Sequence, residues 1–220
     1  MARNVFAENI ETLKGMVLLM GNYVEQSLEQ AQGLLEKRDL SRYDALKIED
    51  DKVDQLEVEL EKKCLTILAL QAPVAYDLRF ITCALKMSTD LERMGDHIRK
   101  IGRKTAHLIE DTDVPIHPAM FQMLIILRSM LKDMLDAFNV ADLVKARQVI
   151  ARDADVNAIQ KEFFREIIDT IMQSHNATQA SACVHMLFIA RSLERIGDHI
   201  KNLGERIIFM VTGELVSHGY

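Results

Sequence analysis

The chain has 220 residues and a mass of 25.1 kDa; 49% of its residues are hydrophobic and 27% are charged. This balance excludes a disordered chain, because it supplies enough apolar surface for a core. Only nine glycines and three prolines occur, and tryptophan is absent, which indicates an all-helical protein. The net charge of −6 gives the surface as a whole no electrostatic reason to bind nucleic acid or anionic lipid. It favours a cationic, metallic or basic protein partner instead.

Apolar residues at intervals of three and four predict three long helices in the first half of the chain. The first covers about residues 4–37. Asp39 is placed to cap the second helix, which continues until Pro73 imposes a turn and opens the third. Short turns between long helices are typical of an antiparallel three-helix bundle.

The second half of the chain repeats this plan after a linker. Pro115 and Pro118 lie close together and break any helix, so they mark the linker and a domain boundary. Beyond them, the same spacing predicts a helix around residues 120–138, another that Asp142 caps, and a last helix after the segment 174–178.

The two halves also match in sequence. The segment 91–102 aligns with the segment 193–204, and eight of the twelve positions are identical. The chain is therefore interpreted as an internal duplication. We predict an all-α fold of six long helices, a tandem repeat of two antiparallel three-helix bundles that cover residues 1–110 and 111–220.

Each repeat carries four polar side chains that the predicted hairpin brings together. Residues at equal distances from the turn lie level in an antiparallel pair, and residues four apart share one helix face. Both rules place four side chains side by side in each half. The first quartet is Asp50, Asp54, Glu92 and Asp96, and the second quartet is Asp153, Asn157, Glu194 and Asp198.

The quartets are the candidate metal sites of the sequence. At 100° per residue they fall away from the apolar stripes of their helices, so we expect them on the bundle surface. Clustered like charges repel and raise their own pKa values, and a bound cation relieves this repulsion. Oxygen ligands suit iron, manganese, magnesium or calcium, with zinc less favoured. His97 and His199 lie too far round the helix from the glutamates to be good ligands.

A simpler alternative is a solvated face held by local ion pairs, for example between Asp96 and Arg99 or Lys100. No glycine-rich phosphate loop and no hydrolase or kinase motif occurs, so the usual parts of an enzyme are missing from the sequence. The three cysteines are scattered and odd in number, and we expect Cys64, Cys83 and Cys183 to be small core residues. The acidic N-terminal residues and the short apolar runs predict a cytoplasmic protein without direct membrane insertion.

The string at residues 70–81, the two Leu-Glu-Arg-x-Gly-Asp-His segments and the duplicated three-helix plan resemble the PhoU family of bacteria. The resemblance covers essentially the whole chain. It implies a cytoplasmic, homodimeric, non-enzymatic regulator. Such a protein works with the phosphate-specific ABC transporter and a sensor histidine kinase to repress the phosphate-starvation response.

The resemblance also implies metal binding, because the family's Glu/Asp-x-x-x-Asp motifs, associated with iron or zinc clusters in some members, map onto the two quartets. Iron is the first choice, with zinc, manganese, magnesium or calcium as alternatives. Asn157 departs from the motif, which weakens the second site. Two rival functions remain open: a carboxylate-bridged metalloenzyme, and a helical adaptor that binds partners without metal.

Overall fold

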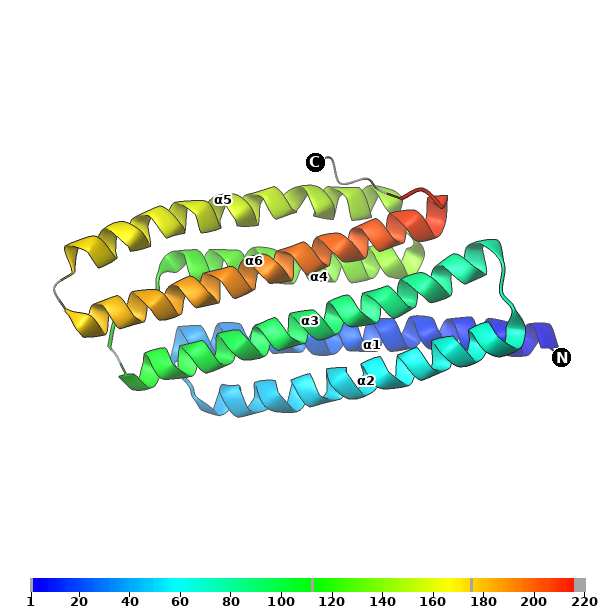
Figure 1. The fold of residues 1–220 in the computed structure, drawn as a ribbon, viewed down its shortest axis with the longest axis horizontal. Helices are drawn as coiled ribbons and strands as arrows, with labels where there is room; N and C mark the ends of the chain where they lie inside the picture. Colours follow the sequence, from blue (N-terminus) through cyan, green and yellow to red (C-terminus); the bar gives the residue numbers. More distant parts are fainter. Residues whose placement is uncertain (1, 112, 175, 216–220) are drawn as a thin grey trace.

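The computed structural model describes residues 2–111, 113–174 and 176–215, and within these ranges it contains helices and no strand. The six helices run antiparallel to their neighbours in the chain (Figure 1). They are α1 (Ala2–Lys37), α2 (Ser41–Gln71), α3 (Ala75–Asp111), α4 (Pro118–Val140), α5 (Leu143–Gln173) and α6 (Ala177–Thr212). The predicted fold of two three-helix repeats is confirmed.

The ends of the helices differ from the predictions in three places. The third helix begins at Ala75, two residues after Pro73, and it runs through Asp111 into the expected linker. The predicted cap at Asp142 is confirmed, whereas the N-cap of α2 is Leu40, one residue after the predicted Asp39, and Leu40 makes no side-chain cap hydrogen bond. Asp142 Oδ1 accepts hydrogen bonds from the backbone N–H groups of Val144 and Lys145, and Asp39 Oδ1 accepts one from Ser41.

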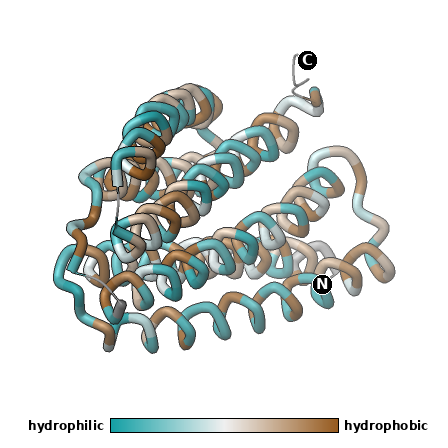
Figure 2. The backbone as a smooth tube through the Cα atoms, turned by 60° about the vertical axis from the view of Figure 1, so that its left-hand side comes forward, coloured by the Kyte–Doolittle hydropathy of each residue, from teal (hydrophilic) through white to brown (hydrophobic). Residues whose placement is uncertain are grey.

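The two repeats pack against each other through equivalent helices. Helices α3 and α6 lie side by side at the centre of the molecule, α1 contacts α4 behind them, and α2 and α5 lie at the outer edges (Figure 1). Hydrophobic and hydrophilic residues alternate along the helices, so each helix turns one face inward (Figure 2). One continuous hydrophobic core joins the two repeats. The division at residue 110 therefore stays a prediction.

The three cysteines are buried and free, as expected for small core residues. Burial raises the pKa of the Cys64 thiol to about 11, with a smaller contribution from Glu61. Among the helices that the structure describes, none combines the length and apolar character needed to cross a membrane.

Candidate functional site

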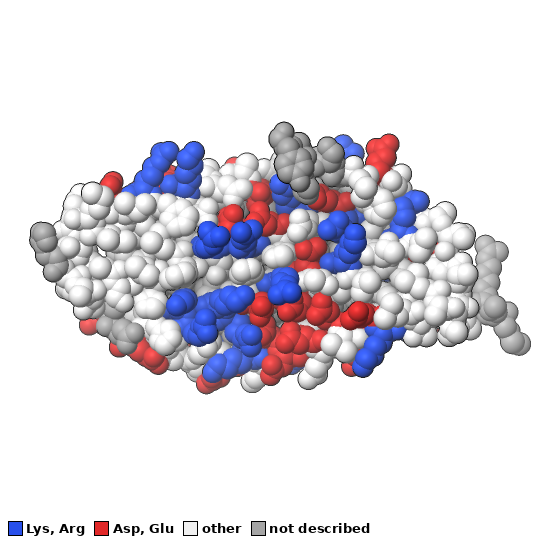
Figure 3. Space-filling model, viewed as in Figure 1, with Lys and Arg blue, Asp and Glu red and all other residues white. Residues whose placement is uncertain are grey.

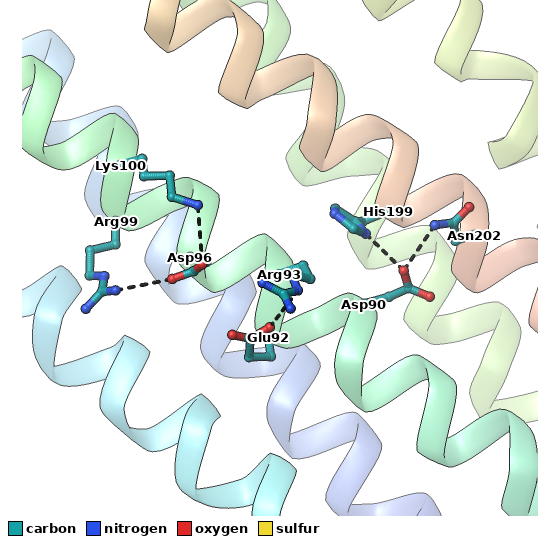
Figure 4. Close-up of polar contacts among 8 residues, drawn as sticks. All are labelled: Asp90, Glu92, Arg93, Asp96, Arg99, Lys100, His199 and Asn202. Carbon is teal, nitrogen blue, oxygen red and sulfur yellow. Dashed lines mark hydrogen bonds and ion pairs between the residues drawn. The ribbon is translucent and has the colours of Figure 1, made fainter.

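The first quartet lies between α2 and α3, in the predicted register. Arg99 binds two of its members: its Nε lies 2.9 Å from Asp50 Oδ2, and its Nη2 lies 3.2 Å from Asp96 Oδ1. Lys100 Nζ lies 3.3 Å from the other oxygen of Asp96 (Figure 4). Glu92 pairs with Arg93 at 3.4 Å. Cations of the chain itself therefore balance much of this acidic cluster.

Burial was predicted wrongly for one member of each quartet. Asp50 is only 3% exposed and Asp153 only 6%, whereas both were expected on the surface. The cause is a glycine on the neighbouring helix. A Cβ atom on Gly95 would lie 3.1 Å from Asp50 Oδ1, and one on Gly197 would lie 2.9 Å from Asp153 Oδ1. The missing side chains let each aspartate lie directly against the facing helix backbone.

The electrostatics of the first quartet follow from this burial. Burial raises the pKa of Asp50 to about 6; the charge of Arg99 opposes this, and the carboxylates of Asp54 and Asp96 add to it. Burial also raises the pKa values of Asp54 and Glu92. Burial acts in the same direction on Asp96, but the hydrogen bond from Lys100 and the charges of Lys100 and Arg99 outweigh it, so the pKa of Asp96 is lowered.

The second quartet is held together differently. Asn157 Nδ2 donates a hydrogen bond of 3.0 Å to Asp153 Oδ2. The other carboxylate oxygen of Asp153 is buried and receives no hydrogen bond from the residues that the structure describes. Burial raises the pKa of Asp153, the charge of Asp198 adds to this, and Lys201 opposes it. Asp198 itself pairs with Arg195 at 3.3 Å.

In the structure, the side chains of the quartets are not gathered around one point that a metal ion could occupy. Within the described part of the chain, no three His, Cys, Asp or Glu side chains converge closely enough to hold one. In the first quartet, the Arg99 guanidinium joins Asp50 to Asp96. In the second quartet, an amide supplies a donor where a fourth carboxylate would supply a ligand. Metal binding by the quartets therefore stays a prediction.

Sequence reasoning missed a polar cluster where α3 meets α6. Asp90 of α3 lies 2.9 Å from His199 Nδ1 and accepts a hydrogen bond of 3.0 Å from Asn202 Nδ2, both on α6 (Figure 4). The rings of His97 and His199 lie 5.9 Å apart, so equivalent residues of the two repeats meet. The internal duplication was the one signal in the sequence that could have indicated this cluster. Two copies of a helix that pack antiparallel bring their equivalent positions together.

Comparison with known proteins extends the match to both repeats. The PhoU domain matches residues 17–105 and again residues 121–207. The chain belongs to the PhoU family. The resemblance found in the sequence is thereby confirmed.

Relatives within the PhoU family match over nearly their full length. The phosphate-specific transport system accessory protein PhoU homolog of Clostridium acetobutylicum is 34% identical over 217 residues, which cover 98% of each chain. The homolog of Caulobacter vibrioides is 35% identical over 210 residues, which are 95% of this chain and 90% of that protein.

Two solved structures share the fold. The crystal structure of PhoU from Pseudomonas aeruginosa has a TM-score of 0.90 and 31% identity, and the match covers 95% of this chain and 100% of that one. The phosphate transport system regulatory protein PhoU from Streptococcus pneumoniae has a TM-score of 0.89 and 29% identity, with 97% and 100% covered.

Proposed function

We propose that this chain is the accessory protein of a phosphate-specific transport system and that it represses the phosphate-starvation response. It acts in the cytoplasm as a homodimer and catalyses no reaction itself. Its partners are the cytoplasmic side of the phosphate ABC transporter and the sensor histidine kinase of the phosphate two-component system. The observation that carries the proposal is the match of both repeats to relatives named as accessory proteins of this transport system, over almost the whole length of each chain.

A deletion strain tests the proposed function. With the gene removed, a reporter for a phosphate-starvation gene should stay active in medium rich in phosphate, because the repressing partner is absent. A plasmid copy of the intact chain should restore repression. Normal repression in the deletion strain would refute the proposal.

Co-purification tests the proposed partners separately. The intact chain, tagged and expressed in cells grown with and without phosphate, should retain the ATPase of the transporter and the kinase. Retention of neither protein would exclude these partners even if the reporter responds. Light scattering on the purified chain would decide between a monomer and a homodimer.

A metal-free adaptor is the second candidate, and the Arg99 bridge favours it. Arg99 pairs with Asp50 and Asp96, so the first quartet is partly neutralised without a metal ion. Elemental analysis of the chain purified without chelator distinguishes the two forms. Stoichiometric iron, zinc, manganese, magnesium or calcium would exclude the metal-free form.

A further inference from the structure

The two repeats are related by an approximate two-fold axis, but their polar contacts across α3 and α6 are not symmetric. The segments 91–102 and 193–204 align, so each position in α3 has an equivalent 102 residues later in α6. The helices pack antiparallel, so a contact between two positions should recur between their equivalents. Asp90 breaks this rule, because its equivalent is Ser192.

The replacement of Asp90 by Ser192 removes a carboxylate from one side of the axis. On the Asp90 side, the carboxylate accepts from Asn202 Nδ2 and contacts His199 Nδ1. The equivalents of that histidine and asparagine are His97 and Lys100. These two side chains and Ser192 line a hollow of about 320 Å³ between α3 and α6. The hollow therefore lies where symmetry would place a second carboxylate.

The hollow is strongly basic in a protein whose net charge is negative. Five of its eight lining residues are cationic, and none is acidic. The cationic residues are Lys100, Arg103, Lys104, Arg191 and Arg195. Figure 3 shows basic side chains gathered on both sides of the junction between α3 and α6.

Several of these donors have no acceptor from the chain. Among the described residues, Arg103 and Arg191 form no ion pair, and Lys104 lies 4.8 Å from the centre of the Phe188 ring without a carboxylate partner. His97 Nδ1 is buried and has no hydrogen-bond partner within the described ranges. Burial, with the charge of Lys100 and the neighbouring His199 ring, lowers the pKa of His97 to about 4, so its imidazole is neutral and can still donate one hydrogen bond.

We propose that this hollow binds the phosphate groups of a small ligand, with one phosphate seated where the Asp90 carboxylate lies on the other side of the axis. The phosphate oxygens accept hydrogen bonds from His97, Ser192 and Lys100, and the arginine guanidinium groups form bidentate hydrogen bonds with them. Three cations that form no ion pair with a described residue, two more that also pair with Asp96 and Asp198, and a volume of about 320 Å³ exceed what one phosphate group requires. The ligand therefore carries a short polyphosphate chain, either free or as part of a nucleotide.

A small ligand fits this surface better than a flat polyanion does. Acidic side chains lie beside the basic ones on the same face (Figure 3), and Asp96 and Asp198 pair with Lys100 and Arg195 at the border of the hollow. An anionic membrane or a nucleic acid would contact both charges, whereas a ligand inside the hollow is surrounded by cationic and neutral residues and by no carboxylate of the lining. Phe188 is 50% exposed and offers a ring face for a nucleotide base.

Calorimetric titration of the intact chain with inorganic phosphate, tripolyphosphate and ATP tests the proposal. The decisive variant is Ser192→Asp, which restores the symmetric carboxylate and fills the hollow without removing any cation. It should weaken binding at least about tenfold, as should the double variant Arg103→Ala with Arg191→Ala. Arg147→Ala is the matched control, because Arg147 is an exposed residue of α5 outside the hollow.

The three probes also identify the source of the phosphate groups. If ATP binds more tightly than tripolyphosphate and Phe188→Leu weakens its binding, the ligand is a nucleotide. If tripolyphosphate binds more tightly than ATP and Phe188→Leu leaves its binding unchanged, the ligand is a free polyphosphate chain. Binding of inorganic phosphate but of neither tripolyphosphate nor ATP would contradict the polyphosphate chain, even if Ser192→Asp abolishes that binding. The Ser192→Asp variant and the Arg103→Ala/Arg191→Ala variant should melt at the temperature of the native chain or above it. Their loss of binding is then not caused by a loss of folding.

Three results would overturn the proposal. The first is that none of the probes binds at millimolar concentration. The second is binding that the folded Ser192→Asp and Arg103→Ala/Arg191→Ala variants retain. The third is tighter binding, through the same arginines, of single-stranded DNA or of vesicles rich in phosphatidylglycerol.

Discussion

Replacing Gly197 by alanine tests whether the buried carboxylates depend on the glycines opposite them. In an exposed helix interior, a glycine-to-alanine change stabilises by about 1 kcal/mol. At Gly197 the new Cβ would lie 2.9 Å from Asp153 Oδ1 and 3.4 Å from Leu127 Cδ2, so the buried aspartate must move. Overpacking of this kind costs about 1–3 kcal/mol, which cancels or reverses the gain. We expect Gly197→Ala to be neutral or destabilising by up to about 2 kcal/mol.

Gly15→Ala is the matched control, because a Cβ on Gly15 would meet nothing within 4 Å. It should stabilise by about 1 kcal/mol. At about 2–4 °C per kcal/mol, the two variants should melt about 2–12 °C apart, measured by far-UV circular dichroism. Gly95→Ala should lie between them, since its Cβ would be 3.1 Å from Asp50 Oδ1. Equal stabilisation by Gly15→Ala and Gly197→Ala would refute the close packing of Asp153.

Three further predictions use other features of the chain. Asp142→Ala removes two hydrogen bonds at the start of α5 and should lower stability by about 1 kcal/mol in urea unfolding; no change would contradict the cap. Burial raises the pKa values of the Cys64 and Cys83 thiols to about 11, so at pH 8 iodoacetamide should label them only after unfolding; rapid labelling of the folded chain would contradict this. Asn157→Asp adds a fourth carboxylate to the second quartet. In the native chain we expect metal to fill the first quartet before the second, and the substitution should bring the occupancy of the second quartet closer to that of the first. Anomalous scattering at limiting metal measures both occupancies. Equal occupancy in the native chain would contradict the charge argument.

Local sequence patterns predicted the helices and the register of each hairpin. The spacing of apolar residues indicates which face of a helix is buried, and Pro73 indicates where the chain turns back. Together these two facts are enough to place Asp50 level with Asp96, and both contact Arg99 in the structure. The cap at Asp142 was equally local, because its acceptor and donors are only two and three residues apart.

The burial of the carboxylates was not predictable from the same patterns. The angular argument measured each side chain against the apolar stripe of its own helix, but Asp50 is covered by the neighbouring helix at Gly95. The contacts of Asp90 with His199 and Asn202 span more than 100 residues. Periodicity indicates that a face is covered without indicating which helix covers it. The junction of α3 and α6 therefore had to come from the structure.

The joining of both repeats in one chain has an evolutionary consequence. If the same repeat formed a symmetric dimer, every residue would occur twice across the axis, so an aspartate at position 90 would fill both sides and a serine would leave both open. Covalent duplication removes this restriction, since each copy mutates independently. Here one copy carries Asp90 and the other carries Ser192. A gene fusion can thus turn a structural contact on one side of an interface into a vacant position on the other, without weakening the first.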